Sequence, residues 1–128
     1  MKIVFKYPPN IKRIKEHFPI KRGVIFTYGN RLYNPDRGEI DDALMVHEET
    51  HTAQQGNNPD EWWDRYFIDK AFRLEQETEA YQNQYKYALD NYNRASRKRL
   101  LRQISKDLSS SLYGNLITEK EAKEIITK

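Results

Sequence analysis

Hydrophobic and polar positions alternate in part over Lys2–Tyr7, near the N-terminus of the chain. Short runs of β-branched and aromatic residues predict strands at Lys2–Tyr7 and Gly23–Tyr28, and a short basic helix is expected between them, after Asn10. Gly29-Asn30 is typical of a two-residue hairpin, so Arg31–Asn34 is predicted to return as a short edge strand. The N-terminal part is therefore expected to form a small, twisted antiparallel sheet.

From residue 39 onward, apolar residues recur every three to four positions, which is the spacing of helices that bury one face. The predicted helices cover Glu39–Gln55, Pro59–Ile68, Asp69–Asn91, Asn93–Leu112 and a short last helix ending near Ile126. Thr118 and Glu121 have the spacing of a capping box at the start of that last helix. The pattern predicts an α+β fold, in which the sheet packs on the helix at 39–55 and a helical C-terminal half follows.

Composition limits the possible domain organisation, metal ligands and location of the chain. The 128 residues are expected to form one domain, covering 1–128, whose core needs no covalent or metal support. Cysteine is absent, so disulfides and thiolate zinc sites are excluded, and any metal must be held by histidine and carboxylate side chains. The net charge of +3 is weak evidence for an acidic partner. The first apolar run is too short for a signal peptide, and none could cross a membrane, which favours a cytoplasmic location.

The residues from His47 to His51 read H-E-x-x-H and fall within the helix predicted at 39–55. Side chains four positions apart on a helix lie on the same face, so His47 and His51 can direct two imidazole nitrogens at one metal ion. Glu48 leaves the helix about 100° away from His47, which places its carboxylate beside a metal-bound water. The alternative is that His47 and His51 are ordinary surface or core histidines without a metal. The third histidine, His17, has no local partner with metal-ligand spacing and is expected at the surface.

A catalytic zinc needs three protein ligands and one open position for water, so the two histidines leave one ligand to be found. The helix predicted at Asp69–Asn91 is the natural source, because its centre carries Glu75, Glu77 and Glu79. A helix turns by about 100° per residue, so these three carboxylates point to different faces. The neighbouring residues do not select one of them.

The stretch Glu77-Thr78-Glu79-Ala80-Tyr81 resembles the E-x-x-A-D or E-x-E-A-N pattern of gluzincin metallopeptidases, whose first glutamate is the third zinc ligand. The resemblance covers roughly Gly23 to Tyr87, and the block His47–Gln55 is similar to small, often phage-encoded peptidase domains. It implies a zincin-like fold, a Zn²⁺ cofactor and hydrolysis of a peptide or protein substrate. The site residues that it implies are His47, His51 and Glu77 as zinc ligands and Glu48 as the general base.

The chain departs from this pattern at Tyr81, where relatives often have an Asp or Asn that supports a ligand histidine. Tyr81 itself, Glu79 or Asp42 could take that role. Hydrolysis also needs a donor that stabilises the oxyanion, and Arg73, Tyr81 and Tyr85 are candidates because they lie near the third ligand in the sequence. None of them is selected by the pattern alone.

Two other functions compete with that of a zinc peptidase. The chain could keep the fold, and even the metal, as a binding or structural module without cleaving anything. It could also be a DNA-associated protease, because the helix at 94–106 carries a basic face that predicts weak contact with nucleic acid. An extended peptide could add to the edge strand expected at Arg31–Asn34. The pattern leaves open the oligomeric state and whether the segment through Pro19 covers the site.

Overall fold

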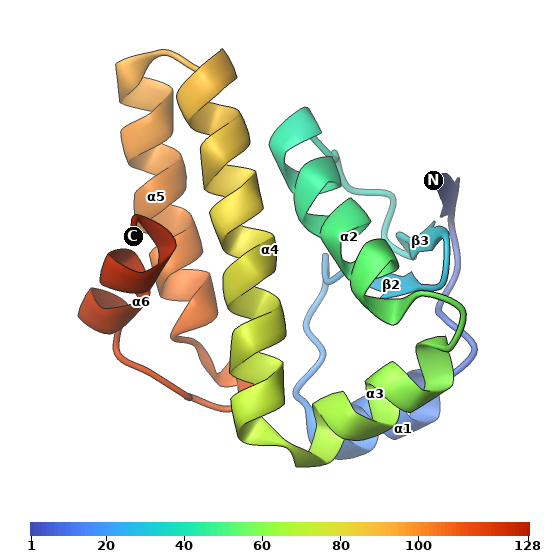
Figure 1. Ribbon diagram of the computed structural model, residues 1–128. Helices are drawn as coiled ribbons and strands as arrows, with labels where there is room; N and C mark the ends of the chain where they lie inside the picture. Colours follow the sequence, from blue (N-terminus) through green and yellow to red (C-terminus); the bar gives the residue numbers. More distant parts are fainter.

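The computed structural model describes residues 1–128 and has an α+β architecture, with six helices and a small three-stranded mixed sheet (Figure 1). The strands are β1 (Lys2–Val4), β2 (Phe26–Tyr28) and β3 (Arg31–Tyr33). The helices are α1 (Ile11–His17), α2 (Asp42–Gln55), α3 (Pro59–Ile68), α4 (Lys70–Asn91), α5 (Arg94–Leu108) and α6 (Glu119–Ile126), with a 3₁₀ turn η1 (Ser111–Tyr113) between the last two. The predicted helical C-terminal half is confirmed.

The sheet differs from the prediction in its topology. Its strand order is β1-β3-β2, so the strand at Arg31–Asn34 is central and its prediction as an edge strand was wrong. The hairpin at Gly29 pairs β2 antiparallel to β3, but β1 pairs parallel to β3, so the prediction of a purely antiparallel sheet was also wrong. A tight hairpin enforces antiparallel pairing only between consecutive strands, and the longer connection through α1 allows parallel pairing of β1. Leu32 is fully buried in this central strand.

The strands are also shorter than predicted. β1 ends at Val4 and β2 begins only at Phe26, because each pairs with the three residues of β3. The residues from Gly23 to Ile25 instead form a connector, whose first N–H donates a hydrogen bond to Asp36 Oδ2 at 2.7 Å. The apolar runs of the sequence therefore extend beyond the segments that pair.

Helix α2 carries the H-E-x-x-H motif and lies between the sheet and α4 (Figure 1). It begins at Asp42 and not at Glu39, because Asp41 caps it and accepts a hydrogen bond from the Leu44 N–H at 2.8 Å. It ends at Gln55, and the residue that follows, Gly56, has a φ of 55° that is strained for other residues. The motif therefore occupies the middle of a 14-residue helix.

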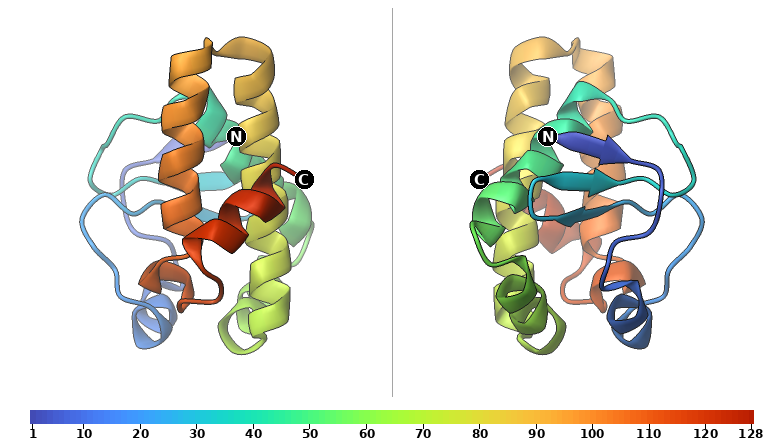
Figure 2. Two further views of the ribbon diagram at one scale, coloured as in Figure 1. Left: turned by 90° about the vertical axis from the view of Figure 1, so that its left-hand side faces the viewer. Right: turned by 90° about the vertical axis from the view of Figure 1, so that its right-hand side faces the viewer.

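The long helix α4 runs through the middle of the molecule, with α2 on one side and α5 and α6 on the other (Figures 1 and 2). Helix α5 ends at Leu108, earlier than predicted, because Ser110 accepts a hydrogen bond from the Leu112 N–H and starts η1. The predicted capping box at Thr118 and Glu121 is present at the start of α6. No helix combines the length and the apolar character that crossing a lipid bilayer requires.

Candidate metal centre

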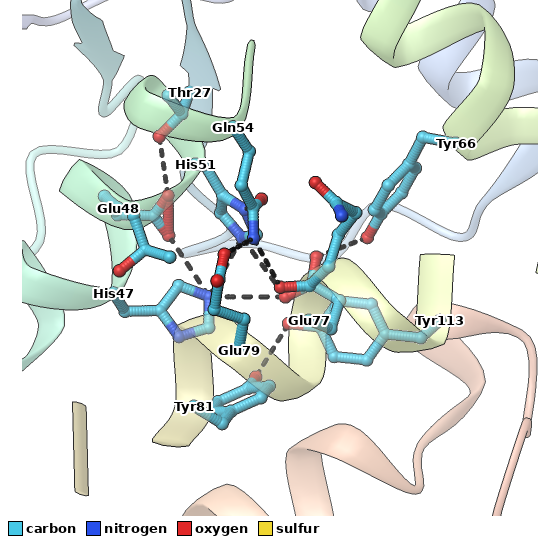
Figure 3. A network of polar contacts seen from close by, with 12 residues as sticks. Thr27, His47, Glu48, His51, Gln54, Tyr66, Glu77, Glu79, Tyr81 and Tyr113 are labelled. Carbon is cyan, nitrogen blue, oxygen red and sulfur yellow. Dashed lines mark hydrogen bonds and ion pairs between the residues drawn. The ribbon is translucent and has the colours of Figure 1, made fainter. Parts of the chain in front are cut away.

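Three side chains from α2 and α4 converge in the interior (Figure 3). Their donor atoms are His47 Nε2, His51 Nε2 and Glu77 Oε1, and the three separations are 3.2 Å between the two nitrogens, 3.3 Å from His47 to Glu77 and 3.2 Å from His51 to Glu77. Each side chain is no more than 6 % exposed. The sequence-predicted set is therefore brought together as a nearly equilateral triangle of nitrogen and oxygen atoms, a group that could hold a metal ion.

Both histidines are oriented by glutamine amides. Nδ1 of His47 lies 3.0 Å from Gln84 Oε1, and Nδ1 of His51 lies 2.8 Å from Gln54 Oε1. An amide oxygen only accepts hydrogen bonds, so the proton of each neutral imidazole belongs on Nδ1 and the lone pair on Nε2. Both lone pairs are therefore directed into the triangle, as a metal ion requires.

The carboxylate of Glu77 is divided between two roles. Its Oε2 accepts a hydrogen bond of 2.6 Å from the buried hydroxyl of Tyr66, in α3. Its Oε1 is left facing the two histidines. Burial and the neighbouring Glu77 charge both raise the pKa of Tyr66 well above its usual value, so this phenol stays a donor at every physiological pH. Tyr66 thus presents one oxygen of Glu77 to the triangle.

Without a metal ion, His51 and Glu77 form an ion pair in the site. Burial lowers the pKa of His51, but the charge and hydrogen bond of Glu77, together with the charge of Glu48 and the hydrogen bond of Gln54, raise it to a net value of about 9. Burial raises the pKa of Glu77, and the two histidines outweigh it and bring that pKa far below its ordinary range. Metal-free protein therefore holds a proton on His51, and a bound metal ion would take its place.

Glu48 lies beside the triangle without belonging to it. Its Oε2 accepts a hydrogen bond of 2.6 Å from Thr27 Oγ1, in strand β2, and its Oε1 is 3.9 Å from His47 Nε2 (Figure 3). The side chain is only 8 % exposed, whereas the next residue, Glu49, is exposed at the surface of α2. A buried carboxylate is thereby held next to a group of metal-type ligands.

A cavity of about 70 Å³ borders the triangle and Glu48. Its other walls are mostly apolar and come from α3, from the N-terminal segment and from η1, through residues that include Phe18, Val24, Trp62, Trp63 and Leu112. The volume corresponds to roughly five water molecules and is too small for a peptide. The segment before Pro19, whose role the sequence left open, contributes Ile14 and Phe18 to the cover of the site.

Side-chain contacts with α3 hold this cover in place. The ring of His17 stacks on that of Phe67, with centroids 4.5 Å apart, and Arg13 forms an ion pair with Asp64. The predicted surface position of His17 is confirmed, since its side chain is exposed. The rest of the cover is the connector that leads from α1 into β2.

The other two glutamates of α4 point away from the triangle. Glu75 and Glu79 are both exposed, and Glu79 Oε1 accepts a hydrogen bond of 2.8 Å from Gln54 Nε2. Glu79 therefore supports His51 only through Gln54. Asp42 is exposed at the start of α2, where it accepts a long hydrogen bond from Tyr87, and takes no part in the site.

Tyr81 packs its ring against that of His47, with centroids 4.4 Å apart, but its hydroxyl is 2.7 Å from that of Tyr113. It therefore supports the histidine by packing alone. Arg73 donates hydrogen bonds to the carbonyl oxygens of Tyr66, Phe67 and Tyr113. Tyr85 is half-buried and packs against the hydrophobic core. None of the three suggested oxyanion donors borders the cavity.

Sequence reasoning missed four residues that position the site: Thr27, Gln54, Tyr66 and Gln84. Two of them carried a usable signal. Gln54 follows His51 by three positions and Gln84 follows Glu77 by seven, so helical spacing places each on the face of its ligand. Thr27 and Tyr66 reach the site from other elements, and only the tertiary fold brings them there.

The sheet edge near the site is partly occupied. The carbonyl oxygen of Thr27 accepts hydrogen bonds from Gln55 Nε2 at 2.9 Å and from Trp63 Nε1 at 3.1 Å. The edge that was predicted to receive an extended peptide, at Arg31–Asn34, is internal to the sheet. Any peptide pairing with β2 would have to displace these two side chains.

Comparisons of the chain with profiles of known protein families, with curated protein sequences and with solved structures find no match. The resemblance to gluzincins consequently rests on the motif residues, chiefly His47–Gln55 and Glu77–Tyr81. Functional conclusions depend on the geometry and chemistry of the site.

Proposed function

We propose that the chain is a zinc-dependent peptidase, in which His47, His51 and Glu77 bind the metal and Glu48 is the general base. The proposal includes a zincin-like arrangement, in which a small sheet lies against the motif helix α2 and a second helix, α4, supplies the third ligand. The single observation that carries it is the buried Glu48 carboxylate beside a His-His-Glu triangle.

The dimensions of the triangle support zinc. Tetrahedral Zn²⁺ with nitrogen and oxygen ligands at about 2.0–2.1 Å has ligand atoms about 3.3–3.4 Å apart. The three separations here are 3.2, 3.2 and 3.3 Å. Two neutral imidazoles and one carboxylate oxygen also form a ligand set typical of catalytic zinc, which leaves the fourth position for water.

The position of Glu48 supports hydrolysis over simple metal storage. A bound Zn²⁺ would lower the pKa of a coordinated water toward about 7 and polarise the carbonyl group of a substrate. Glu48 then takes the proton of the attacking water and delivers it to the leaving amine, while Thr27 holds its other oxygen. A metal-binding scaffold has no need of this buried carboxylate.

Access of a substrate requires a change at the cover. A cavity of about 70 Å³ admits water and a small side chain but no peptide backbone. The N-terminal segment contacts α3 through Arg13, His17 and the buried Phe18, and it lies outside the α2–α4 packing, so we propose that this segment is the part that opens. Opening there would expose Glu48 and the fourth metal position together.

The test combines metal content with turnover. Untagged wild-type protein is expected to hold about one zinc per chain by elemental mass spectrometry, and His47→Ala to hold none. Hydrolysis of a peptide library, followed by mass spectrometry, should be lost in Glu48→Gln and kept in Glu49→Gln, which removes the adjacent, exposed carboxylate from the same helix. Absence of zinc from reconstituted wild type would refute the proposal.

A non-catalytic metal-binding module is the second candidate, and the small volume of the cavity favours it. In that case zinc would bind as above, while wild type and Glu48→Gln would give identical library profiles. The double variant Arg13→Ala/His17→Ala, which removes two exposed contacts between the N-terminal segment and α3, should then stay inactive as well. Cleavage by that double variant, absent from its Glu48→Gln counterpart, would instead support a peptidase that is covered by its own N-terminal segment.

A further inference from the structure

Helix α5 carries a row of four cations on one side. Arg94, Lys98, Arg102 and Lys106 follow one another at four-residue spacing, so they lie along one side of the helix over about 18 Å. All four are exposed, and none forms an ion pair or donates a side-chain hydrogen bond within the protein. Like charges four residues apart destabilise a helix. This basic row is therefore a cost to the fold that a bound anion would relieve.

The basic row borders a groove that helix α6 completes. A groove of about 530 Å³ between α5 and α6 is lined by Lys98 and Arg102 from the row and by Lys120 and Lys123 from α6. The left view of Figure 2 shows α6 crossing in front of α4 beside α5. Glu119 is the one acidic residue in the lining. Four cations against one carboxylate give the groove a net positive charge.

A buried hydroxyl lies in the lining of this groove. Ser105 is 2 % exposed, and its Oγ has no hydrogen-bond partner in the protein. A buried hydroxyl without a partner is unfavourable unless a ligand or water satisfies it. The groove thus combines unpaired positive charge with a free hydrogen-bonding group, which is the chemistry that binds phosphate oxygens.

We propose that the basic row and the α5–α6 groove bind the phosphate backbone of nucleic acid. The row extends beyond the groove at both ends, to Arg94 and Lys106, so several phosphates in succession fit it better than one. The surface lies on the side of α4 opposite α2 and the metal centre (Figure 1). The binding is therefore independent of the proposed peptidase activity and survives removal of metal.

Binding is measured by fluorescence anisotropy with labelled 20-nucleotide single-stranded and duplex DNA, using the full chain with and without zinc. Four phosphate contacts, one for each cation of the basic row, give a slope near −3.6 for log K against log salt on duplex DNA, so affinity should fall about 150-fold from 50 to 200 mM NaCl. Lys98→Gln/Arg102→Gln should reduce the slope by about two. Ser105→Ala is expected to weaken binding severalfold, without changing the slope.

The matched control is Lys70→Gln/Lys86→Gln, which removes two exposed lysines from α4 and the same net charge. It should bind like wild type, with circular dichroism melts showing that every variant is folded. Equal weakening by the control pair, or no binding at 50 mM NaCl, overturns the proposal. Complete displacement by millimolar pyrophosphate, together with a slope near one, would also overturn it in favour of a small phosphate ligand.

Discussion

Helix α4 is packed on both sides, against α2 chiefly through polar side chains and against α5 and α6 chiefly through apolar ones. On the α2 side, Glu77 and Gln84 meet the two histidines of the motif, and each of these four side chains has a specific polar partner. On the other side, Ile104, Leu108 and Ile126 belong to the hydrophobic core and are no more than 3 % exposed.

The two sides of α4 should respond differently to substitution of their buried residues. Apolar burial is non-directional and contributes stability in proportion to the area removed from water. Buried polar groups contribute little net stability, but the loss of one partner leaves the other unsatisfied. The α2 side of α4 should therefore determine metal binding, and the α5–α6 side should determine whether the chain stays folded.

The largest expected effect is the loss of metal binding in Glu77→Ala. Loss of residues that only support a ligand costs about 10- to 100-fold in metal affinity, so loss of a ligand should cost more than 100-fold. Competition with a chromophoric chelator measures the affinity. Glu75→Ala should bind zinc like wild type, because that side chain is exposed and distant from the triangle. Retention of zinc by Glu77→Ala would show that another carboxylate is the ligand.

Next in size is the destabilisation of Leu108→Ala, on the other side of α4. Leu108 is fully buried, so truncation should lower the free energy of unfolding by about 2–5 kcal/mol, as urea titration would measure. Zinc content per folded molecule should stay unchanged without denaturant. Loss of zinc from this folded variant would mean that the two sides of α4 are coupled.

A smaller effect is expected from the glutamine that orients His47. Gln84→Met removes the acceptor for Nδ1 and should weaken zinc binding by about 10- to 100-fold. Gln82→Met is the control, because Gln82 donates its hydrogen bond to Ile125 O, on the α6 side. Equal zinc affinities of the two variants would contradict a role for Gln84 in orienting the ligand.

The smallest effect concerns the metal-free protein and pH. The pKa of His51 is raised to about 9, above the value of about 6.5 in an unfolded chain. The protonated form is therefore favoured by folding, and its contribution to stability is complete below pH 6.5 and is lost as pH rises through 9. Thermal melts in chelator should show Tm of wild type falling from pH 7 to 9.5 relative to His51→Gln. Parallel curves for the two proteins would contradict the His51–Glu77 ion pair.

The sequence sufficed wherever a feature depends on neighbours in the chain. The helices, the capping box at Thr118 and Glu121 and the approach of His47 to His51 all follow from local spacing. The third ligand could not be chosen from spacing, which left Glu75 and Glu79 as alternatives to Glu77. Only the resemblance to gluzincins favoured Glu77. The choice depends on which face of α4 meets α2, and that is a property of tertiary packing.

Features that depend on distant segments could not be predicted. The parallel pairing of β1 with β3 joins residues separated by a whole helix, and no local pattern specifies it. The same holds for Thr27 and Tyr66. Their hydroxyls contact Glu48 and Glu77 from other elements, β2 and α3, and no spacing in the sequence links each pair. Hydroxyl groups are common at such positions, so their sequence context carries no distinguishing signal.

The N-terminal cover also has a kinetic consequence. The cavity beside His47, His51 and Glu77 is bordered by residues of α1 and of the connector that follows it, and its volume of about 70 Å³ is too small for a chelator. We therefore expect a chelator to reach an ion bound there only when this segment moves away. The rate at which a chelator removes the ion should therefore reach a plateau as chelator is added, and that plateau is the opening rate of the segment itself.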